Sequence, residues 1–227
     1  MLSIIIPTYN EKNNLAELVS RIKTAAPEAE IILVDDNSPD NTADFARHLG
    51  LKVLVRPTRE GLSSAVLEGF KLAKGDILGV MDADLSHPPE ILPEMLNLLK
   101  AGKADLVVGS RLVSGGGQRG WNWHNKFFSW LARVAARPLT NIKDVTSGFF
   151  LLKRSVIDGV SLNPIGFKIL LEIITKGKYR SAQEVPIIFA DRSGSQSKMG
   201  AVEICEYFVQ LGLLYKDSLW GKLKKRR

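Results

Sequence analysis

The sequence predicts an α/β fold in which a mostly parallel β-sheet is flanked by helices. Short apolar, β-rich runs alternate through the first half of the chain with segments whose apolar residues recur every three or four positions. The second pattern is that of one face of a helix, and apolar runs without alternation are typical of parallel strands buried on both faces. A chain of 227 residues is long enough for one large domain, or for one domain with an appendage.

Five strands are expected in the first half, and the helices between them follow from the spacing of apolar residues. The expected strands cover residues 2–6, 31–34, 52–55, 77–81 and 106–108. Three groups of apolar residues mark the helices: Leu15, Leu18, Val19 and Ile22; Ala65, Val66, Gly69 and Leu72; and Ile91, Met95, Leu98 and Leu99. Because ligands of such sheets bind beyond the carboxyl ends of the strands, the site is expected there.

The second half of the chain follows a glycine-rich stretch at residues 114–120. An amphipathic helix is expected at about residues 121–139, strands at 147–154 and 182–192, and a second amphipathic helix from about residue 201 onward. Tryptophans and basic residues on the first helix favour a membrane interface, and packing on another domain or copy is the alternative. Cys205 lies in an apolar stretch of the last helix and is expected in the core.

The composition is that of a globular protein with an excess of positive charge. The net charge of +7 and the isoelectric point of 9.5 point to an anionic partner, such as a nucleic acid, a phosphorylated small molecule or an acidic membrane. A single cysteine excludes an intrachain disulfide and favours a reducing compartment. The sequence has neither a signal-peptide pattern nor an apolar run long enough to span a bilayer, so a soluble or peripheral protein is expected.

The stretch VMDADLSHPPE, residues 80–90, ends the fourth expected strand in two carboxylates. Asp82 and Asp84 suit a surface turn that caps the next helix, an acid/base dyad, or a clamp for Mg²⁺ or Mn²⁺. Their position beside four other polar strand ends favours the metal clamp. His87 is expected to be a loop residue, because no second histidine stands at ligand spacing.

The other strand ends carry residues suited to a nucleotide and to phosphates. Tyr9 can line a base, Glu11 is either a hydrogen-bond acceptor for a ligand or a first-turn helix acid, and Asp36 can bind a base or ribose within a turn. Four cations can neutralise a diphosphate and a second phosphorylated substrate: Arg59, Arg111, Arg192 and Lys198. Neither the glycine fingerprint of dinucleotide folds nor a P-loop motif is present in the sequence.

Seven motifs resemble, in order, those of the polyprenyl (dolichyl) phosphate mannose synthases of glycosyltransferase family 2. They are SIIIPTYNEKNNL, ILVDDNSPDNT, REGLSSAVLEGF, VMDADLSHPPE, LVVGSR, DVTSGFFLLKR and IGFKILLEI. The resemblance runs from Ser3 to about Lys198 and implies a GT-A, Rossmann-like fold. It assigns residues 1–199 to a catalytic domain and leaves 200–227 as a C-terminal amphipathic helix and basic tail, without a transmembrane domain.

The resemblance implies inverting, metal-dependent transfer of mannose from GDP-mannose to a polyprenyl (dolichyl) monophosphate. Its implied cofactor is Mg²⁺ or Mn²⁺, its implied place is the cytoplasmic face of a membrane as a peripheral protein, and nucleic acid is not among its expected partners. A phosphate monoester is already ionised near neutral pH, so the acceptor needs no general base, which disfavours the acid/base dyad. The alternatives are a family 2 transferase that uses UDP-glucose or another nucleotide sugar, and a non-catalytic module that binds anionic surfaces.

Matching positions imply roles for individual residues. The implied donor-nucleotide residues are Pro7, Tyr9, Glu11, Val34, Asp36, Arg59, Asp82, Arg192 and Lys198. The implied metal residues are Asp82, Asp84 and Ser86, and the implied acceptor-phosphate residues are Arg111, Ser129, Lys126 and Arg133. Catalysis is assigned to Asp84, Arg111, Ser129 and Arg192.

The chain departs from the family pattern at three places. Ser86 stands where the family often has glutamine, and its shorter side chain has less reach toward a metal. Asn125 stands where some archaeal relatives carry an arginine, so Lys126 or Arg133 is expected to take over that role. The C-terminal membrane spans of many relatives have no counterpart in the sequence, so membrane attachment is expected to rest on the amphipathic helices, the basic tail or an unknown anchoring subunit.

Overall fold

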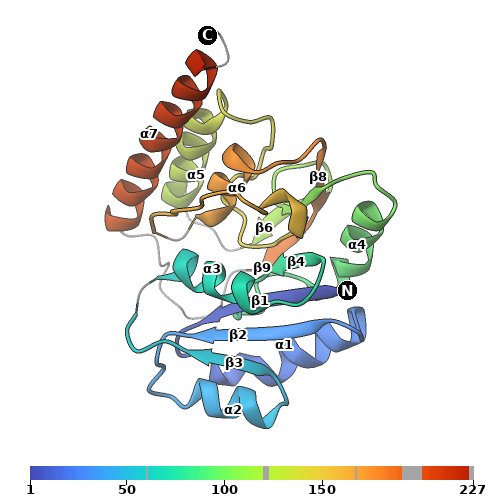
Figure 1. Cartoon of the computed structure of the whole chain (residues 1–227). Coiled ribbons are helices and arrows are strands. Elements are labelled where there is room, and N and C mark those ends of the chain that lie inside the picture. Colours follow the sequence, from blue (N-terminus) through green and yellow to red (C-terminus); the bar gives the residue numbers. More distant parts are fainter. Residues whose placement is uncertain (60, 120–122, 167, 191–200, 225–227) are drawn as a thin grey trace.

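The protein is built on a twisted central sheet, seen here in a computed structural model that describes residues 1–59, 61–119, 123–166, 168–190 and 201–224 (Figure 1). The strands of the main sheet within these ranges are β1 (Leu2–Thr8), β2 (Glu30–Asp35), β3 (Lys52–Val55), β4 (Ile77–Val80), β5 (Leu106–Ser110), β7 (Phe150–Lys153) and β8 (Ala182–Pro186). They lie in the order β3-β2-β1-β4-β7-β5-β8. A separate pair joins β6 (Gly117–Arg119) to β9 (Ile188–Ala190).

The parallel sheet that the sequence predicts is confirmed, with one strand reversed. β7 runs antiparallel to both of its neighbours, β4 and β5, while the other pairs of the main sheet are parallel. The apolar run of β7 predicts a strand but not its direction, because a strand buried on both faces shows the same pattern either way. The first five strands still end at the same edge of the sheet, so the five polar strand ends meet there.

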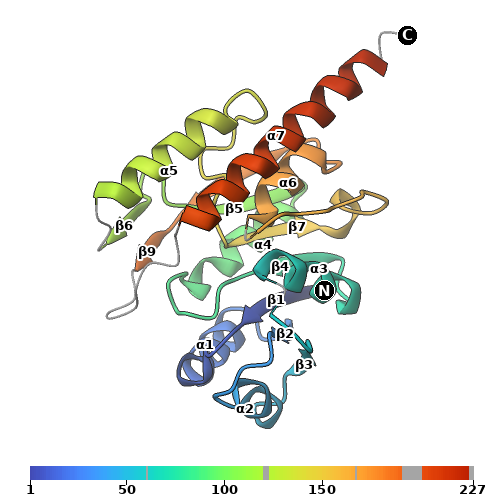
Figure 2. The same cartoon turned by 90° about the vertical axis from the view of Figure 1, so that its left-hand side faces the viewer.

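Helices cover both faces of this sheet. They are α1 (Lys12–Ala25), α2 (Thr42–His48), α3 (Leu62–Leu72), α4 (Leu92–Lys100), α5 (Trp123–Ala136), α6 (Ile169–Lys176) and α7 (Ala201–Lys224), with short 3-10 helices η1 (Pro89–Ile91) and η2 (Arg154–Val156). One face packs against α1, α2 and α4, and the other against α3, α6 and α7. Figure 2 shows α5 and α7 lying side by side on the second face.

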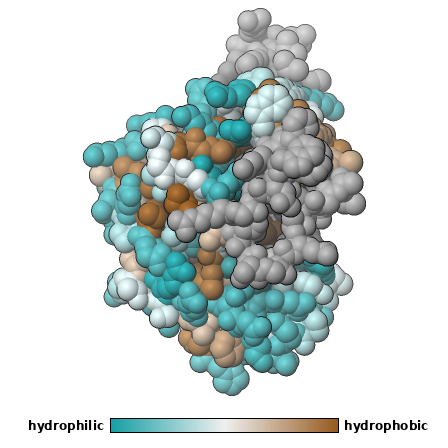
Figure 3. Space-filling view, turned by 180° about the vertical axis from the view of Figure 1, so that it is seen from behind, coloured by the Kyte–Doolittle hydropathy of each residue, from teal (hydrophilic) through white to brown (hydrophobic). Residues whose placement is uncertain are grey.

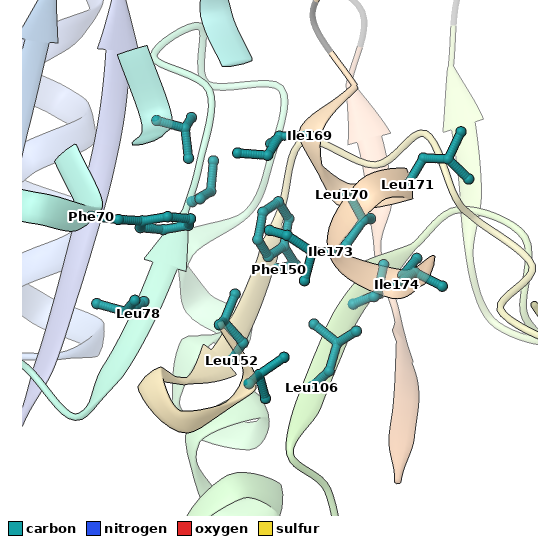
Figure 4. Packing of buried hydrophobic residues seen from close by; sticks show 14 of the residues in the cluster. Phe70, Leu78, Leu106, Phe150, Leu152, Ile169, Leu170, Leu171, Ile173 and Ile174 are labelled. Atoms are coloured by element: carbon teal, nitrogen blue, oxygen red, sulfur yellow. The ribbon is translucent and has the colours of Figure 1, made fainter. Parts of the chain in front are cut away.

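The core divides into two clusters because successive side chains of a strand point to opposite faces. In β1, Ile4 and Ile6 pack toward α1, while Ile5 packs toward α3. Figure 4 shows the second of these clusters, in which α6 lies over Phe150 and Leu152 of β7. Packing on both faces therefore leaves the strand ends as the exposed part of the sheet where polar side chains can gather.

Two expectations about the second half of the chain are wrong. The strand expected at 182–192 divides into β8 and β9, because its partner β5 ends at Ser110 and the chain beyond Ile187 pairs with β6. Cys205 is exposed and not in the core. Helix α7 instead buries Tyr207 and Leu211, which are four residues apart and share a face that Cys205 does not.

Large apolar side chains are exposed mainly on α5 and α7. They are Trp130, Val134, Phe208, Val209 and Leu213. On the face shown in Figure 3, hydrophilic residues break the hydrophobic surface into small patches. In the part of the chain that the structure describes, none of the helices combines the length and the apolar character that crossing a bilayer requires.

Candidate active site

The ends of β1 and β2 lie side by side and lead into the residues expected to bind a nucleotide. Pro7 is paired in register with Val34, and Thr8 with Asp35. The Thr8 hydroxyl donates a hydrogen bond to the Asp35 carboxylate at 2.8 Å, which ties the two strand ends together. Val34 packs in the core cluster, so its side chain is not available to a ligand. The paired strand ends thus hold the backbone that leads into Tyr9 and Asp36.

Asp36 is held by Arg56, for which the sequence predicts no role. The Arg56 side chain is only 2% exposed, and its Nε donates to Asp36 Oδ1 at 2.6 Å. Its other nitrogens donate to the Ser64 hydroxyl at 2.6 Å and to the Gly61 carbonyl at 2.8 Å. A guanidinium bonded on three sides fixes the orientation of the carboxylate that it pairs with. Asp36 is therefore a preoriented acceptor at the end of β2.

Tyr9 and Arg59 meet at the same edge of the sheet. The Arg59 guanidinium carbon lies 4.4 Å from the centroid of the Tyr9 ring, within cation–π range. Glu11 is mostly buried at the start of α1, where its carboxylate accepts a hydrogen bond from Asn14 Nδ2 at 2.9 Å. The structure thus brings together the aromatic ring of Tyr9 and the guanidinium of Arg59, which the sequence predicts for one ligand.

The chain turns sharply after β4. Leu85 has a φ of 62°, in the left-handed region that costs a bulky residue about 1 kcal/mol or more. Ser86 donates its backbone N–H to Asp84 Oδ1 at 3.1 Å, and its hydroxyl donates to the same oxygen. The Ser86 side chain is therefore bonded to the carboxylate of Asp84, and the turn directs Asp82 and Asp84 toward the same region.

His87 completes a cluster with these carboxylates, which the sequence does not predict. It lies in a loop as expected, but its side chain is 2% exposed and its Nδ1 is 3.7 Å from Asp82 Oδ2. Ligand atoms of Asp82, Asp84 and His87 all lie within 4.8 Å of one another. The ring packs between Phe149 and Phe189, at centroid distances of 5.6 and 5.3 Å. Burial lowers the pKa of His87 and outweighs the opposing charge of Asp82, which favours the neutral imidazole.

Gly148 leaves the space that the Asp82 carboxylate occupies. A Cβ at Gly148 would lie 2.7 Å from Asp82 Oδ2, closer than non-bonded atoms approach. Within the described ranges, the buried Nδ1 of His87 has no hydrogen-bond partner. Two carboxylates and a neutral imidazole nitrogen are ligands that Mn²⁺ accepts, and the carboxylates also suit Mg²⁺. The residues present therefore fit a divalent cation.

Arg111, at the end of β5, is bound by Asp144. Its Nε and Nη2 donate to the two carboxylate oxygens at 2.8 and 2.7 Å, and its backbone N–H donates at 3.0 Å. Burial by itself would raise the pKa of Asp144, but the hydrogen bonds and charge of Arg111 outweigh burial and lower it. The guanidinium carbon also lies 5.4 Å from the centroid of the Phe189 ring. Arg111 is thus held in one orientation close to His87, which contacts the same ring.

A second cation, Lys168, lies at the start of α6. Its Nζ donates to the Thr146 carbonyl at 2.9 Å, while Arg111 Nη2 donates to the Thr146 hydroxyl at 3.0 Å. Burial and the charge of Arg111 lower the pKa of Lys168 to about 8, against the opposing charges of Asp82 and Asp144. Lys168 therefore interacts electrostatically with Arg111 and with the turn that carries Asp82 and Asp84, called the acidic turn below.

Several predicted phosphate-binding residues are not tested by the structure. Arg192 and Lys198 lie outside the described residues. Lys126 and Ser129 belong to α5, but their side chains are outside the described part of the helix. Arg133 lies on the same helix, and its side chain is partly buried. The roles of these five residues stay predictions.

The comparison with known proteins decides the family. The model of glycosyl transferase family 2 matches residues 3–160. The chain belongs to glycosyl transferase family 2. This glycosyltransferase is 47% identical over 95% of its length to a dolichol-phosphate mannosyltransferase from Pyrococcus furiosus, of which it spans 64%. It is 38% identical over 94% of its length to the dolichol-phosphate mannosyltransferase of Saccharomyces cerevisiae, of which it spans 86%. The family predicted from the seven motifs is confirmed.

Solved structures confirm the GT-A fold of this family 2 glycosyltransferase. Glucosyl-3-phosphoglycerate synthase from Mycobacterium tuberculosis, in complex with Mn²⁺, UDP-glucose and phosphoglyceric acid, matches 93% of the chain and 80% of its own, with a TM-score of 0.72 and 18% identity. A mannosyltransferase from Pyrobaculum calidifontis, in complex with GDP-Man and Mn²⁺, matches 92% of the chain and 62% of its own, with a TM-score of 0.62 and 17% identity. At such identities the likeness shows the fold alone.

Besides His87, the sequence did not predict three site residues of the glycosyltransferase, although they lie within or beside its apolar runs. Arg56 directly follows β3, Asp144 begins DVTSGFFLLKR ahead of β7, and Lys168 lies in IGFKILLEI. A charge at such a position requires a partner, because burying it alone is costly. This signal indicates that each charge is paired, but not with which residue.

Proposed function

We propose that this glycosyltransferase transfers mannose, with inversion and in a metal-dependent reaction, from GDP-mannose to a polyprenyl (dolichyl) monophosphate. The observation that carries the proposal is the contact of one ring, Phe189, with both His87 of the acidic cluster and Arg111. A candidate metal site and a candidate phosphate site are therefore close enough for two phosphorylated substrates to meet. The names of the curated relatives support mannose as the sugar and a polyprenyl phosphate as the acceptor.

In this proposal the donor nucleotide binds at the ends of β1 and β2. Asp36, which Arg56 holds in place, accepts hydrogen bonds from the base or the ribose. Tyr9 lines the base, and Arg59 over its ring supplies positive charge toward the diphosphate. Pro7 and Glu11 lie at the same edge of the sheet and are proposed to bind the same nucleotide.

The acidic turn is proposed to hold the diphosphate through a cation. Asp82 and Asp84 would bind Mg²⁺ or Mn²⁺, which when bound neutralises the charge that develops on the leaving group. Gly148 keeps the space for the Asp82 carboxylate. Arg192 and Lys198 are proposed to donate further hydrogen bonds to the same leaving group.

Arg111 is proposed to bind and orient the acceptor phosphate. Asp144 fixes the plane of the Arg111 guanidinium, so its positive charge is held in a defined position. Because the phosphate monoester carries its own negative charge, its attacking oxygen requires orientation and not deprotonation. Residues of α5 are proposed to complete this site: Ser129, with Lys126 or Arg133.

A transfer assay with several nucleotide sugars and a short polyprenyl phosphate tests the proposal. GDP-mannose with Mn²⁺ or Mg²⁺ is expected to give lipid-linked mannose of inverted anomeric configuration, and EDTA is expected to abolish the product. Asp84→Ala should lose this activity, whereas Arg111→Ala should depress transfer and leave GDP affinity nearly unchanged. Transfer from UDP-glucose alone would support the other family 2 reaction. Binding to anionic vesicles without any transfer would support a non-catalytic module.

We also propose that the protein works as a peripheral protein on the cytoplasmic face of a membrane. The exposed apolar side chains of α5 and α7 support this, since apolar groups on amphipathic helices enter the headgroup region. Replacing Trp130 and Leu213 by serine should reduce flotation with anionic vesicles. The matched control is Ile188→Ser, which removes an exposed apolar side chain from β9. Equal flotation of all three proteins would contradict the proposal.

A further inference from the structure

The acidic turn contains one side chain that the proposed reaction leaves without a task. His87 is 2% exposed, and its buried Nδ1 has no hydrogen-bond partner among the residues that the structure describes. Buried polar nitrogens are normally bonded, so an unbonded one at a candidate site requires an explanation. This nitrogen lies 3.7 Å from a carboxylate oxygen of Asp82, and Asp84 belongs to the same cluster of ligand atoms.

A hydrogen bond to Asp82 does not provide that explanation. The separation of 3.7 Å between His87 Nδ1 and Asp82 Oδ2 exceeds the 2.7 to roughly 3.2 Å of an N–H···O bond. The separation lies between those expected for neighbouring and for opposite ligands of one cation. Metal–ligand bonds of about 2.1 Å place neighbouring octahedral ligands roughly 3 Å apart and opposite ones roughly 4.2 Å apart. The ligand atoms of all three residues lie within 4.8 Å of one another, a limit slightly larger than the separation of opposite ligands.

The surroundings hold the imidazole in this orientation. Its ring is packed between Phe149 and Phe189, and the left-handed backbone of Leu85 folds the turn so that residue 87 returns to Asp82. Ser86, which precedes it, is bonded to Asp84 through its hydroxyl. A strained turn that is maintained in this way is common at functional sites.

We propose that His87 Nδ1 is a ligand of the divalent cation bound by Asp82 and Asp84, and that this nitrogen supplies the coordination that the short side chain of Ser86 does not. The inference rests on the metal dependence of the proposed function. An imidazole ligand favours Mn²⁺ over Mg²⁺, because Mg²⁺ prefers oxygen ligands and bonds that are nearly ideally octahedral. The site is therefore a manganese-preferring one, with two carboxylates and one nitrogen from the protein.

Pulsed EPR of Mn²⁺ on the full chain tests this directly. The protein is loaded with Mn²⁺ and GDP, once with natural histidine and once with ¹⁵N-labelled histidine. A nitrogen coupling that changes with the label is expected in the wild type and should be absent in His87→Phe and His87→Gln. Mn²⁺ affinity measured by titration should fall at least tenfold in both variants, as for other changes at metal ligand shells, and Mg²⁺ affinity should fall less.

His48→Gln is the matched control, because His48 is exposed on α2. Its coupling and its Mn²⁺ affinity should equal those of the wild type. Mn²⁺ binding without a histidine coupling in the wild type would overturn the assignment and leave the proposed metal dependence intact. A coupling that persists in His87→Phe would also overturn it. If Mn²⁺ does not bind at all and transfer proceeds in EDTA, both the inference and the metal dependence of the proposed function are wrong.

Discussion

The pair of Arg111 and Asp144 offers the sharpest test of how the site is held together. Asp144 is completely buried and accepts three hydrogen bonds from Arg111, two from the guanidinium and one from the backbone. Asp144→Asn keeps the shape of the side chain but removes its charge, and it places an amide donor against guanidinium donors. The Arg111 charge then loses its carboxylate partner in a mostly buried position.

The expected cost can be worked from this geometry. Breaking a buried ion pair by removing one partner lowers the free energy of unfolding by about 3–5 kcal/mol. Asparagine retains one acceptor oxygen, so we expect the lower end, about 3 kcal/mol. With a urea m-value of about 2 kcal/mol per molar, the midpoint should shift by roughly 1.5 M. Transfer to the lipid phosphate should fall as well, because Arg111 loses its fixed orientation.

Urea unfolding followed by circular dichroism measures the loss. The control is Asp44→Asn, which breaks an exposed pair between Asp44 and Arg47 on α2 and should cost less than about 1 kcal/mol. The lowered pKa of Asp144 means that its contribution is present above the ordinary value of 3.8 and is lost as the pH falls toward the folded value. The difference between wild type and Asp144→Asn should therefore shrink below about pH 4. A loss under about 1 kcal/mol at pH 7 would refute the idea that Asp144 holds Arg111.

Three further predictions concern other charges of the site. The pKa of Lys168 is lowered to about 8 from 10.5, so folding releases a proton between these pH values. In that range the free energy of unfolding of the wild type should therefore rise with pH relative to that of Lys168→Met. If urea titrations give parallel curves for the two proteins, this prediction is wrong. Gly148→Ala should weaken Mn²⁺ binding by calorimetry about tenfold, because the new Cβ displaces the Asp82 carboxylate; an unchanged affinity would argue against Asp82 as a ligand. Arg56→Met leaves Asp36 buried without its cation, so the free energy of unfolding in urea should fall by about 3 kcal/mol. The affinity for GDP should fall as well, and full GDP binding would exclude Asp36 from the donor site.

The strands and their common edge could be predicted because they depend on local patterns. An apolar run such as residues 31–34 and a helical repeat such as Leu15, Leu18 and Ile22 are properties of neighbouring residues. The direction of β7 could not be predicted in this way, since a strand buried on both faces reads the same in both directions. The division of residues 182–192 between two sheets depended likewise on where a distant strand, β5, ends.

The sequence by itself determined the α/β class, the family and the edge at which the site lies, because these follow from periodicity and from motifs that are contiguous in the chain. Only the tertiary structure decided which charges pair. Asp36 pairs with Arg56, and Arg111 pairs with Asp144, although the partners are far apart in the sequence. The order of the strands in the sheet brings them together. The same holds for His87, because its approach to the carboxylates depends on the left-handed turn at Leu85 and on rings from distant strands. Composition and spacing alone carry no information on such approaches, since they depend on backbone direction and packing.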